Sequence, residues 1–572
     1  MAGALIRGGL VVDGTGAPGV VDDVAVRDGR IVPLDECEPG APEIDATGLV
    51  VAPGFVDLHT HYDAQLTWDP SASPSSLHGV TTVFGGNCGF TIAPAGEAHA
   101  PYLMRMMARV EGMPLEALEA GLPWDWTGYA DWFDRFEGRI GVNAGFHIGH
   151  SAVRRVVMGE ACHDPATEEQ VDAMVALVRS ACEAGAMGFS TSTAPTHNDG
   201  DGEPVPSRAA STAELVALAG AVRDVPGTTL EAILAGCING FTDDERDLLA
   251  ALSSAAERPL NWNVLGVSSM NPAGHGSQLA ASDHADERGA RVVALTLPHT
   301  MRLRLSFLSG FVLDGFPGWR EVLSLPVPER IAALSDPAVR RRLDAGANSE
   351  EAGLLRGLAS WRGLEVIEAF APENQAHEGR TIGQIVDERS DGADPFDVLL
   401  DIVVADELRT GLRPSGLKDS KADWQLRADV WKDPRVVIGG SDAGAHLDMM
   451  CGAIYSTALL SHGVRDFGVI TLEEAVHRIT DVPARLYGLR DRGRITPGAH
   501  ADLVLFDAAT VGYQPERMRY DLPGGAWRLH SDATGIDRVL VNGVTVVRDG
   551  EPTGATPGTL LRSGRDTDTV LP

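Results

Sequence analysis

Two histidines separated by a single residue, His59 and His61, are the side chains of this sequence best suited to chemistry. They stand at the end of the apolar run Val51–His59, which predicts a buried strand. Because side chains alternate along a strand, both imidazoles are expected on the same face at its C-terminal end. Neutral imidazole is a common metal ligand, so the pair indicates half of a divalent-cation site. The alternative is that the histidines only cap a core strand.

Other ligand-type side chains follow other apolar runs. Cys88 comes just after the run Thr81–Gly86, Asp442 comes just after Val436–Gly440, and Glu231 lies within a further run. Several independent runs that deliver such residues to the same edge indicate a site more strongly than one run does. Taken alone, Cys88 could equally be a small buried apolar residue.

The spacing of the apolar runs predicts the element that positions these side chains. Strand-like runs alternate with helical patterns such as Glu168–Ala184 and Thr212–Arg223, which is typical of repeated βα units around a parallel sheet. Eight such units fit a (β/α)8 barrel, in which the chemistry lies at the C-terminal ends of the strands. The eight predicted strands are Val51–His59, Thr81–Gly86, Val142–Ile148, Met187–Thr191, Thr228–Leu234, Leu260–Leu265, Arg291–Leu297 and Val436–Gly440.

Both ends of the chain read as short strands separated by Gly, Pro and Asp turns, and we expect them to form one small β domain. The predicted boundaries are residues 1–52 and 490–572 for the two parts of this domain and 53–489 for the barrel. A long, partly helical insertion rich in arginine is expected at about 298–435.

Composition excludes several classes of function. The 572 residues carry 80 acidic against 47 basic side chains, a net charge of −33, which argues against nucleic acid and anionic membranes as partners. The apolar runs are too short to cross a bilayer, and the start of the chain lacks the features of a secretion signal. The six cysteines show no pairing rhythm and are expected to be reduced, so we predict a cytoplasmic enzyme.

At this point the sequence resembles the amidohydrolase superfamily, in particular its D-aminoacylase (N-acyl-D-amino-acid deacylase) branch. The resemblance covers almost the whole chain and rests on an ordered set of motifs: Gly54–Gln65, Gly79–Gly89, Gly185–Thr191, Gly440–Ala443, Pro497–Leu503 and Asp521–Ala526. It implies a (β/α)8 barrel with a small β-sandwich built from both termini, in agreement with the prediction from the residues.

The resemblance also implies roles for individual residues. His59, His61, Cys88 and Asp442 match metal-site residues of the family, and Asp442 matches the residue that moves a proton from water to the departing amine. Cysteine here stands where other branches carry a carboxylated lysine. The sequence agrees, because no lysine precedes Lys418.

The chain departs from the family pattern at the fifth and sixth strands, where the family carries metal-binding histidines. Glu231 and the asparagines of Leu260–Leu265 stand there instead. Glu231 is therefore a candidate ligand, and His150 and His197 are candidates for compensation. His150 would act as a ligand and His197 would contact the substrate. Each of these histidines could equally be an ordinary hydrogen-bonded residue.

A substrate carboxylate would need a cationic partner. Arg302 and Arg304, just beyond the seventh run, are candidates, since guanidinium binds carboxylates in a bidentate manner. The alternative is that they pair with acids on an acidic surface.

These observations predict a hydrolase that cleaves the amide bond of an N-acyl-(D-)amino acid with metal-activated water. Thiolate, imidazole and carboxylate ligands suit Zn²⁺, with one ion per chain favoured, and a homo-oligomer is possible. Two alternatives stay open. One is a cyclic-amide hydrolase or a non-hydrolytic lyase on the same barrel, and the other is a catalytically silent barrel that binds a small ligand.

Overall fold

The computed structural model describes residues 3–310, 312–389, 392–415 and 419–572. Residues 1–2 of the predicted β domain and 311, 390–391 and 416–418 of the predicted insertion lie outside the described residues. The chain divides into two compact units: unit 1 comprises Met1–His299, Ser420–Leu447 and Gly452–Pro572, and unit 2 comprises Thr300–Asp419 and Asp448–Cys451. Each unit is described by itself.

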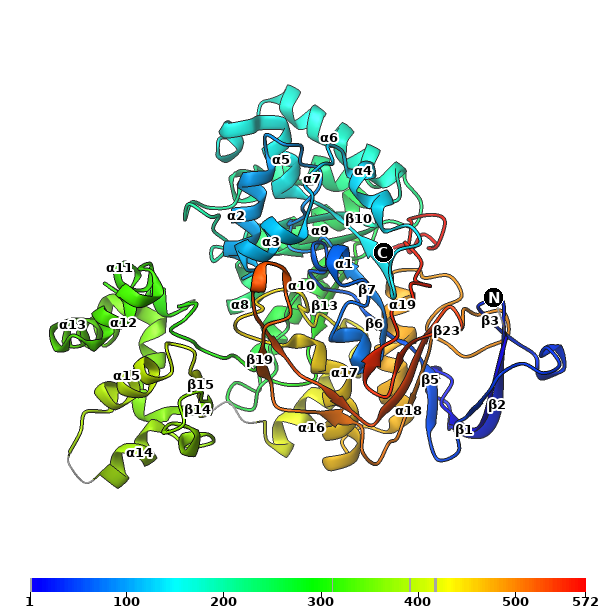
Figure 1. Ribbon diagram of the computed structural model, residues 1–572. Helices are drawn as coiled ribbons and strands as arrows, with labels where there is room; N and C mark the ends of the chain where they lie inside the picture. The colour runs from blue at the N-terminus through cyan, green and yellow to red at the C-terminus, as the bar shows by residue number, and fades with distance from the viewer. Residues whose placement is uncertain (1–2, 311, 390–391, 416–418) are drawn as a thin grey trace. The chain divides into compact units, whose positions relative to one another are not determined.

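Unit 1 contains the predicted (β/α)8 barrel (Figure 1). Neighbouring strands are parallel, and the end of the first strand pairs with the segment after the last through Thr60 and Ala443, which closes the barrel. In the described part of the chain, each of the eight predicted runs overlaps a barrel strand: β6 (Phe55–Asp57), β7 (Val80–Gly85), β8 and β9 (Asn143–Phe146 and Ile148–Gly149), β10 (Gly188–Ser192), β11 (Thr229–Ile233), β12 (Leu260–Trp262), β13 (Val292–Thr296) and β16 (Val436–Ile438).

Helices follow the barrel strands as the sequence pattern predicts. The expected helix at Glu168–Ala184 is α6 (Glu168–Glu183), and the one at Thr212–Arg223 is α7 (Thr212–Gly220). Thr167 begins α6 with a capping box, in which its hydroxyl accepts from the Gln170 amide while the Gln170 side chain accepts from Thr167 N. Further helices of unit 1 are α2 (Ala100–Val110), α9 (Asp243–Ala256), α10 (Gly274–Asp286), α16 (Lys421–Val430), α18 (Leu472–Ile479) and α19 (Asp481–Leu486).

The first predicted strand, Val51–His59, is wrong as a single element. The structure divides it at Gly54 into β5 (Val50–Pro53), which belongs to the terminal β domain, and β6, which belongs to the barrel. A Cβ atom at Gly54 would lie 2.1 Å from the Thr81 hydroxyl oxygen, so only glycine fits at the crossing. One apolar run therefore supplies strands to two sheets.

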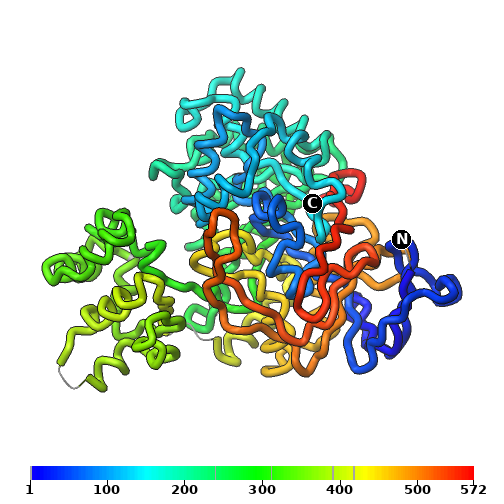
Figure 2. Tube along the Cα trace, viewed as in Figure 1, coloured from blue at the N-terminus to red at the C-terminus, as the bar shows by residue number. Residues whose placement is uncertain are grey.

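The chain termini build one mixed sheet, as expected for the small β-sandwich domain. Figure 2 shows the blue N-terminal segment and the red-orange C-terminal segment of unit 1, and the central strand pairing is antiparallel between β5 and β17. The strands described in this sheet are β1 (Ala4–Val11), β2 (Val20–Arg27), β3 (Arg30–Val32), β4 (Glu43–Asp45), β5, β17 (Leu503–Phe506), β22 (Ile536–Val541), β23 (Val544–Arg548) and β24 (Glu551–Pro552).

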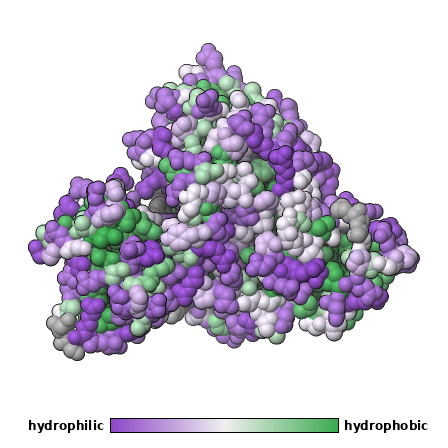
Figure 3. Space-filling view, in the orientation of Figure 1, coloured by the Kyte–Doolittle hydropathy of each residue, from purple (hydrophilic) through white to green (hydrophobic). Residues whose placement is uncertain are grey.

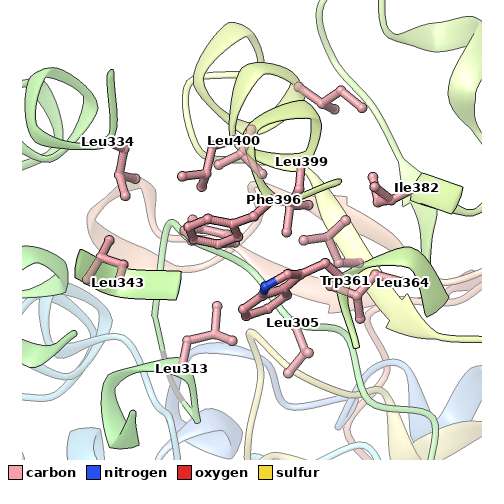
Figure 4. Close-up of a cluster of buried hydrophobic side chains, with 14 of the residues drawn as sticks. Leu305, Leu313, Leu334, Leu343, Trp361, Leu364, Ile382, Phe396, Leu399 and Leu400 are labelled. Carbon is pink, nitrogen blue, oxygen red and sulfur yellow. The ribbon is translucent and has the colours of Figure 1, made fainter. Parts of the chain in front are cut away.

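Unit 2 has its own core. Figure 4 shows buried side chains such as Trp361, Phe396 and Leu400 packed together, and the Trp361 and Phe396 rings lie 4.8 Å apart between centroids. The insertion was predicted at about 298–435, whereas the main segment of unit 2 is Thr300–Asp419 and α16 belongs to unit 1. Its main elements are α12 (Val327–Ser335), α13 (Pro337–Ala347), α14 (Ile382–Arg389), α15 (Pro395–Ala405), β14 (Leu364–Glu368) and β15 (Gly411–Pro414).

Hydrophilic residues cover most of the face seen in Figure 3, in keeping with the strongly acidic composition. Among the described residues, no helix is both long and apolar enough to span a membrane.

Candidate metal centre

His59 and His61 follow β6 at the end of the barrel where the strands finish, and both side chains are fully buried. Two backbone hydrogen bonds join this segment to the one after β16: His61 N donates to Ala443 O (2.7 Å), and Asp442 N donates to His59 O (3.0 Å). The closure of the barrel therefore brings Asp442 to both histidines. Gly444 allows the approach, because a Cβ atom there would lie 2.7 Å from the His61 carbonyl carbon.

Cys88 lies in the loop after β7 and is held in a left-handed backbone conformation, with φ of 56°. Glu231 of β11 fixes this conformation by accepting a hydrogen bond from Cys88 N at 2.7 Å. The hydroxyl of Ser190 accepts from the next amide, Gly89 N, at 3.0 Å. Left-handed conformations are costly for residues other than glycine and cluster at functional sites. Three strands thus position one sulfur atom.

The donor atoms converge. Cys88 Sγ lies 3.3 Å from His59 Nε2 and 3.8 Å from His61 Nε2. Zinc–nitrogen and zinc–sulfur bonds of about 2.0 and 2.3 Å in tetrahedral geometry place these atoms about 3.6 Å apart, so the observed distances fit a zinc-sized ion. The ligand atoms of these three residues all lie within 4.8 Å of one another.

Asp442 completes the group from the more open side. Its Oδ1 lies 3.1 Å from His61 Nε2 and 3.6 Å from His59 Nε2, and its φ is 61°. The Asp442 side chain is 15% exposed, whereas both histidine side chains are fully enclosed. A small molecule entering the site would therefore meet Asp442.

Burial and neighbouring charges give the side chains of this site different pKa values. Burial lowers the pKa of His59 to about 3, so its imidazole is neutral, as a metal ligand must be. Burial alone would also lower the pKa of His61, but the Glu111 and Asp442 carboxylates outweigh it and raise that pKa to about 10. A metal ion that binds His61 Nε2 must therefore displace a proton. Burial works against the charge of Asp442, yet its hydrogen bond to His61 keeps the pKa of this carboxyl well below its usual range. Burial raises the pKa of the Cys88 thiol, and a bound cation would favour its thiolate.

Glu111 is a site residue that the sequence did not indicate. It follows α2, is 2% exposed, and its Oε2 lies 3.6 Å from His61 Nε2. Glu111, His61 and Asp442 form a second group whose ligand atoms lie within 4.8 Å of one another. No motif marks Glu111, and its only sequence signal is a carboxylate in the long segment between β7 and β8.

The remaining candidates in unit 1 lie in different surroundings. Glu231 Oε1 is 3.9 Å from His59 Nδ1, so this carboxyl group lies behind the ligand atoms and joins neither group. Burial raises the pKa of Glu231 to about 8. His150 is turned away, because its Nε2 lies 2.9 Å from Glu214 and its Nδ1 2.9 Å from the Thr191 hydroxyl. The ion pair of Glu214 with Arg154 completes this buried cluster, and we therefore withdraw His150 as a ligand.

His197 is the last candidate in unit 1, and Asn263 contacts the centre from the sixth strand. His197 is half-buried, its Nδ1 lies 2.7 Å from the Ser192 hydroxyl, and burial lowers its pKa to about 4. At the end of the sixth strand, Asn263 Nδ2 lies 3.2 Å from His59 Nε2. Glu231 and Asn263 therefore contact Cys88 and His59 from the two strands that lack histidine.

Both candidate arginines belong to unit 2. Arg304 is 2% exposed, and its guanidinium donates to the Glu368 carboxylate (3.3 Å) and to the Arg409 carbonyl (2.5 Å). This guanidinium forms hydrogen bonds inside unit 2, so the prediction that Arg304 binds the substrate is wrong. Arg302 is half-buried, and its part in substrate binding stays a prediction.

Known proteins resemble this chain over almost its whole length. The sequence model of the Amidohydrolase family matches residues 42–547 of this chain. The chain belongs to the amidohydrolase family. D-aminoacylase from Alcaligenes xylosoxydans xylosoxydans is 28% identical over 572 residues and covers 97% of each chain. N-acyl-D-aspartate deacylase from the same organism is 29% identical over 569 residues, covering 98% of this chain and 95% of the relative.

A solved structure agrees with these relatives. A D-aminoacylase, described with a binuclear metal center and with one-metal activation, matches with a TM-score of 0.63 at 26% identity, covering 98% of this chain and 99% of that one. The predicted family and branch are confirmed, as is the fold class. In this amidohydrolase, His59, His61 and Cys88 form a candidate metal site, and Asp442 Oδ1 lies next to it.

Proposed function

We propose that this amidohydrolase cleaves the amide bond of an N-acyl-D-amino acid with one zinc ion held by His59, His61 and Cys88. The observation that carries the proposal is the placement of Asp442 Oδ1, 3.1 and 3.6 Å from the two imidazole nitrogens that also approach Cys88 Sγ. Three protein ligands leave one position open, as in catalytic zinc sites. The substrate class comes from the relatives, two of which are a D-aminoacylase and an N-acyl-D-aspartate deacylase.

Zinc, when bound, supplies Lewis acidity that activates water and polarises a carbonyl group. Asp442 supplies the proton chemistry. Its carboxylate is charged because its pKa is held low, and it is the more open member of the group. It can accept a proton from the attacking water and return it to the leaving nitrogen.

Other residues of unit 1 orient these groups. Glu231 holds the Cys88 backbone and faces His59 Nδ1, so we assign it a positioning role instead of a ligand role. His197 remains our candidate for substrate contact. Its pKa of about 4 keeps it neutral, so it would act through a hydrogen bond.

The test combines metal analysis with a product assay on the full chain. We expect about one zinc per chain, lost in Cys88→Ala and kept in the matched control Cys182→Ala, whose buried thiol lies in α6. Zinc-loaded protein should release free amine and carboxylate from N-acetyl-D-amino acids in preference to the L forms. A zinc-loaded protein that releases no amine would refute the proposal. Ring-opened or decarboxylated products would point to the cyclic-amide or lyase alternative.

A further inference from the structure

Glu111 belongs to the second group of ligand atoms, with His61 and Asp442, and the proposed reaction gives it no role. Glu111 Oε2 and Asp442 Oδ1 lie 3.6 and 3.1 Å from His61 Nε2. Atoms bound at about 2.1 Å to one ion lie about 3.0 Å apart in octahedral and about 3.4 Å apart in tetrahedral coordination. The observed distances are therefore close to those of a ligand set.

The surroundings of Glu111 call for a positive charge. Its carboxylate is buried directly after the C-terminal end of the eleven-residue helix α2, where the helix dipole disfavours negative charge. Asp442 places a second carboxylate on the same histidine. A buried carboxyl group close to a second, largely enclosed one is costly unless a proton or a cation lies between them. The backbone also fixes the arrangement, since His446 N donates to Glu111 O and joins the segment after β16 to the end of α2.

We propose that His61, Glu111 and Asp442 form a second, oxygen-rich cation position that competes with the His59–His61–Cys88 position for a single divalent ion. The inference rests on the proposed zinc site, because both groups use the same Nε2 atom of His61. That nitrogen has one lone pair and binds one ion at a time. One nitrogen and two carboxylate oxygens suit a harder ion such as Mn²⁺, whereas the cysteine position suits Zn²⁺.

Manganese binding tests the ligand set directly. The full chain is stripped with a chelator and titrated with Mn²⁺, and the free ion is followed by electron paramagnetic resonance. We expect Glu111→Gln to weaken Mn²⁺ binding by at least about tenfold, as loss of a metal-site group usually does. Cys88→Ala should leave Mn²⁺ binding nearly unchanged, and so should the matched control Glu119→Gln, an exposed glutamate in α3 (Leu115–Gly121).

Two results would overturn the ligand set: wild-type Mn²⁺ affinity in Glu111→Gln, or an equal loss in Cys88→Ala. The first would mean that a proton on His61 balances the two carboxylates. Circular dichroism and thermal midpoints of each variant show whether it is folded. If Glu111→Gln does not fold, Glu111→Asp gives the same test, because a shortened carboxylate should weaken Mn²⁺ binding while keeping its charge.

Competition tests the shared histidine. One equivalent of Zn²⁺ should release bound Mn²⁺ from the wild type, and should release much less from Cys88→Ala. A chain that keeps both ions at once would overturn the competition. These readouts do not involve turnover. Exchange of Mn²⁺ for Zn²⁺ without amide cleavage would support this inference and refute the proposed function. Amide cleavage together with Mn²⁺ binding that is unchanged in Glu111→Gln would support the proposed function and refute this inference.

Discussion

Replacing Glu231 separates a positioning role from a ligand role. Its Oε2 accepts the 2.7 Å hydrogen bond from Cys88 N, and the side chain is 1% exposed. Glu231→Ala leaves that buried N–H without its acceptor, which costs about 1–3 kcal/mol. The left-handed conformation of Cys88 adds a tendency to relax, since it costs about 1–3 kcal/mol in a residue other than glycine. The sulfur atom is then free to leave its position opposite His59.

We expect Glu231→Ala to weaken zinc binding by about 10- to 100-fold, equal to about 1.4–2.7 kcal/mol. Glu231→Gln should bind zinc nearly as well as the wild type, because its amide oxygen can accept the same hydrogen bond. The amide is also neutral, like a carboxyl group whose pKa is raised to about 8.

The assay is competition for zinc between the protein and a chromophoric chelator at pH 7. Thermal midpoints with and without zinc serve as a second readout, since an ion bound only by the folded chain stabilises it. Equal losses in the Gln and Ala variants would refute the reasoning and identify Glu231 as a direct ligand. Unchanged affinity in both would show that the Cys88 backbone needs no such support.

Three further predictions follow from other contacts. Gly444→Ala should displace His61 and abolish zinc binding, because its Cβ would lie 2.7 Å from the His61 carbonyl. Gly498→Ala, with a similar φ of 92° and nothing within 4 Å, should keep zinc, and equal zinc contents in the two variants would contradict this. Asp442→Asn should keep zinc but lower kcat by about 10²- to 10⁴-fold, measured as amine release; unimpaired turnover would exclude Asp442 as the proton carrier. Burial lowers the pKa of His78 from 6.5 to about 4, so between these pH values His78 binds a proton in the unfolded chain but not in the folded chain. Stability present above pH 6.5 is therefore lost as the pH falls toward 4, by about 3 kcal/mol in full. In His78→Gln the thermal midpoint should fall less steeply as the pH is lowered over this range. A slope equal to that of the wild type would count against a lowered pKa of His78.

The local pattern of the sequence determined the barrel and its central residues. The runs that became β6, β7 and β16 are short and apolar, and each is followed by a ligand-type residue beyond the end of its strand. A strand period of two predicted His59 and His61 on one face; in the structure β6 ends at Asp57, and both histidines follow it. These features depend on neighbours in the chain, so a single sequence suffices to predict them.

Only the tertiary structure decided which distant side chains reach this centre. Glu111 lies near His61 because α2 ends beside the segment after β16, and no sequence motif predicts that contact. His150 follows a barrel strand as a ligand would, yet Glu214 binds it, and Arg304 is enclosed within unit 2. Distances between side chains far apart in sequence depend on barrel closure and packing, which a one-dimensional pattern does not contain.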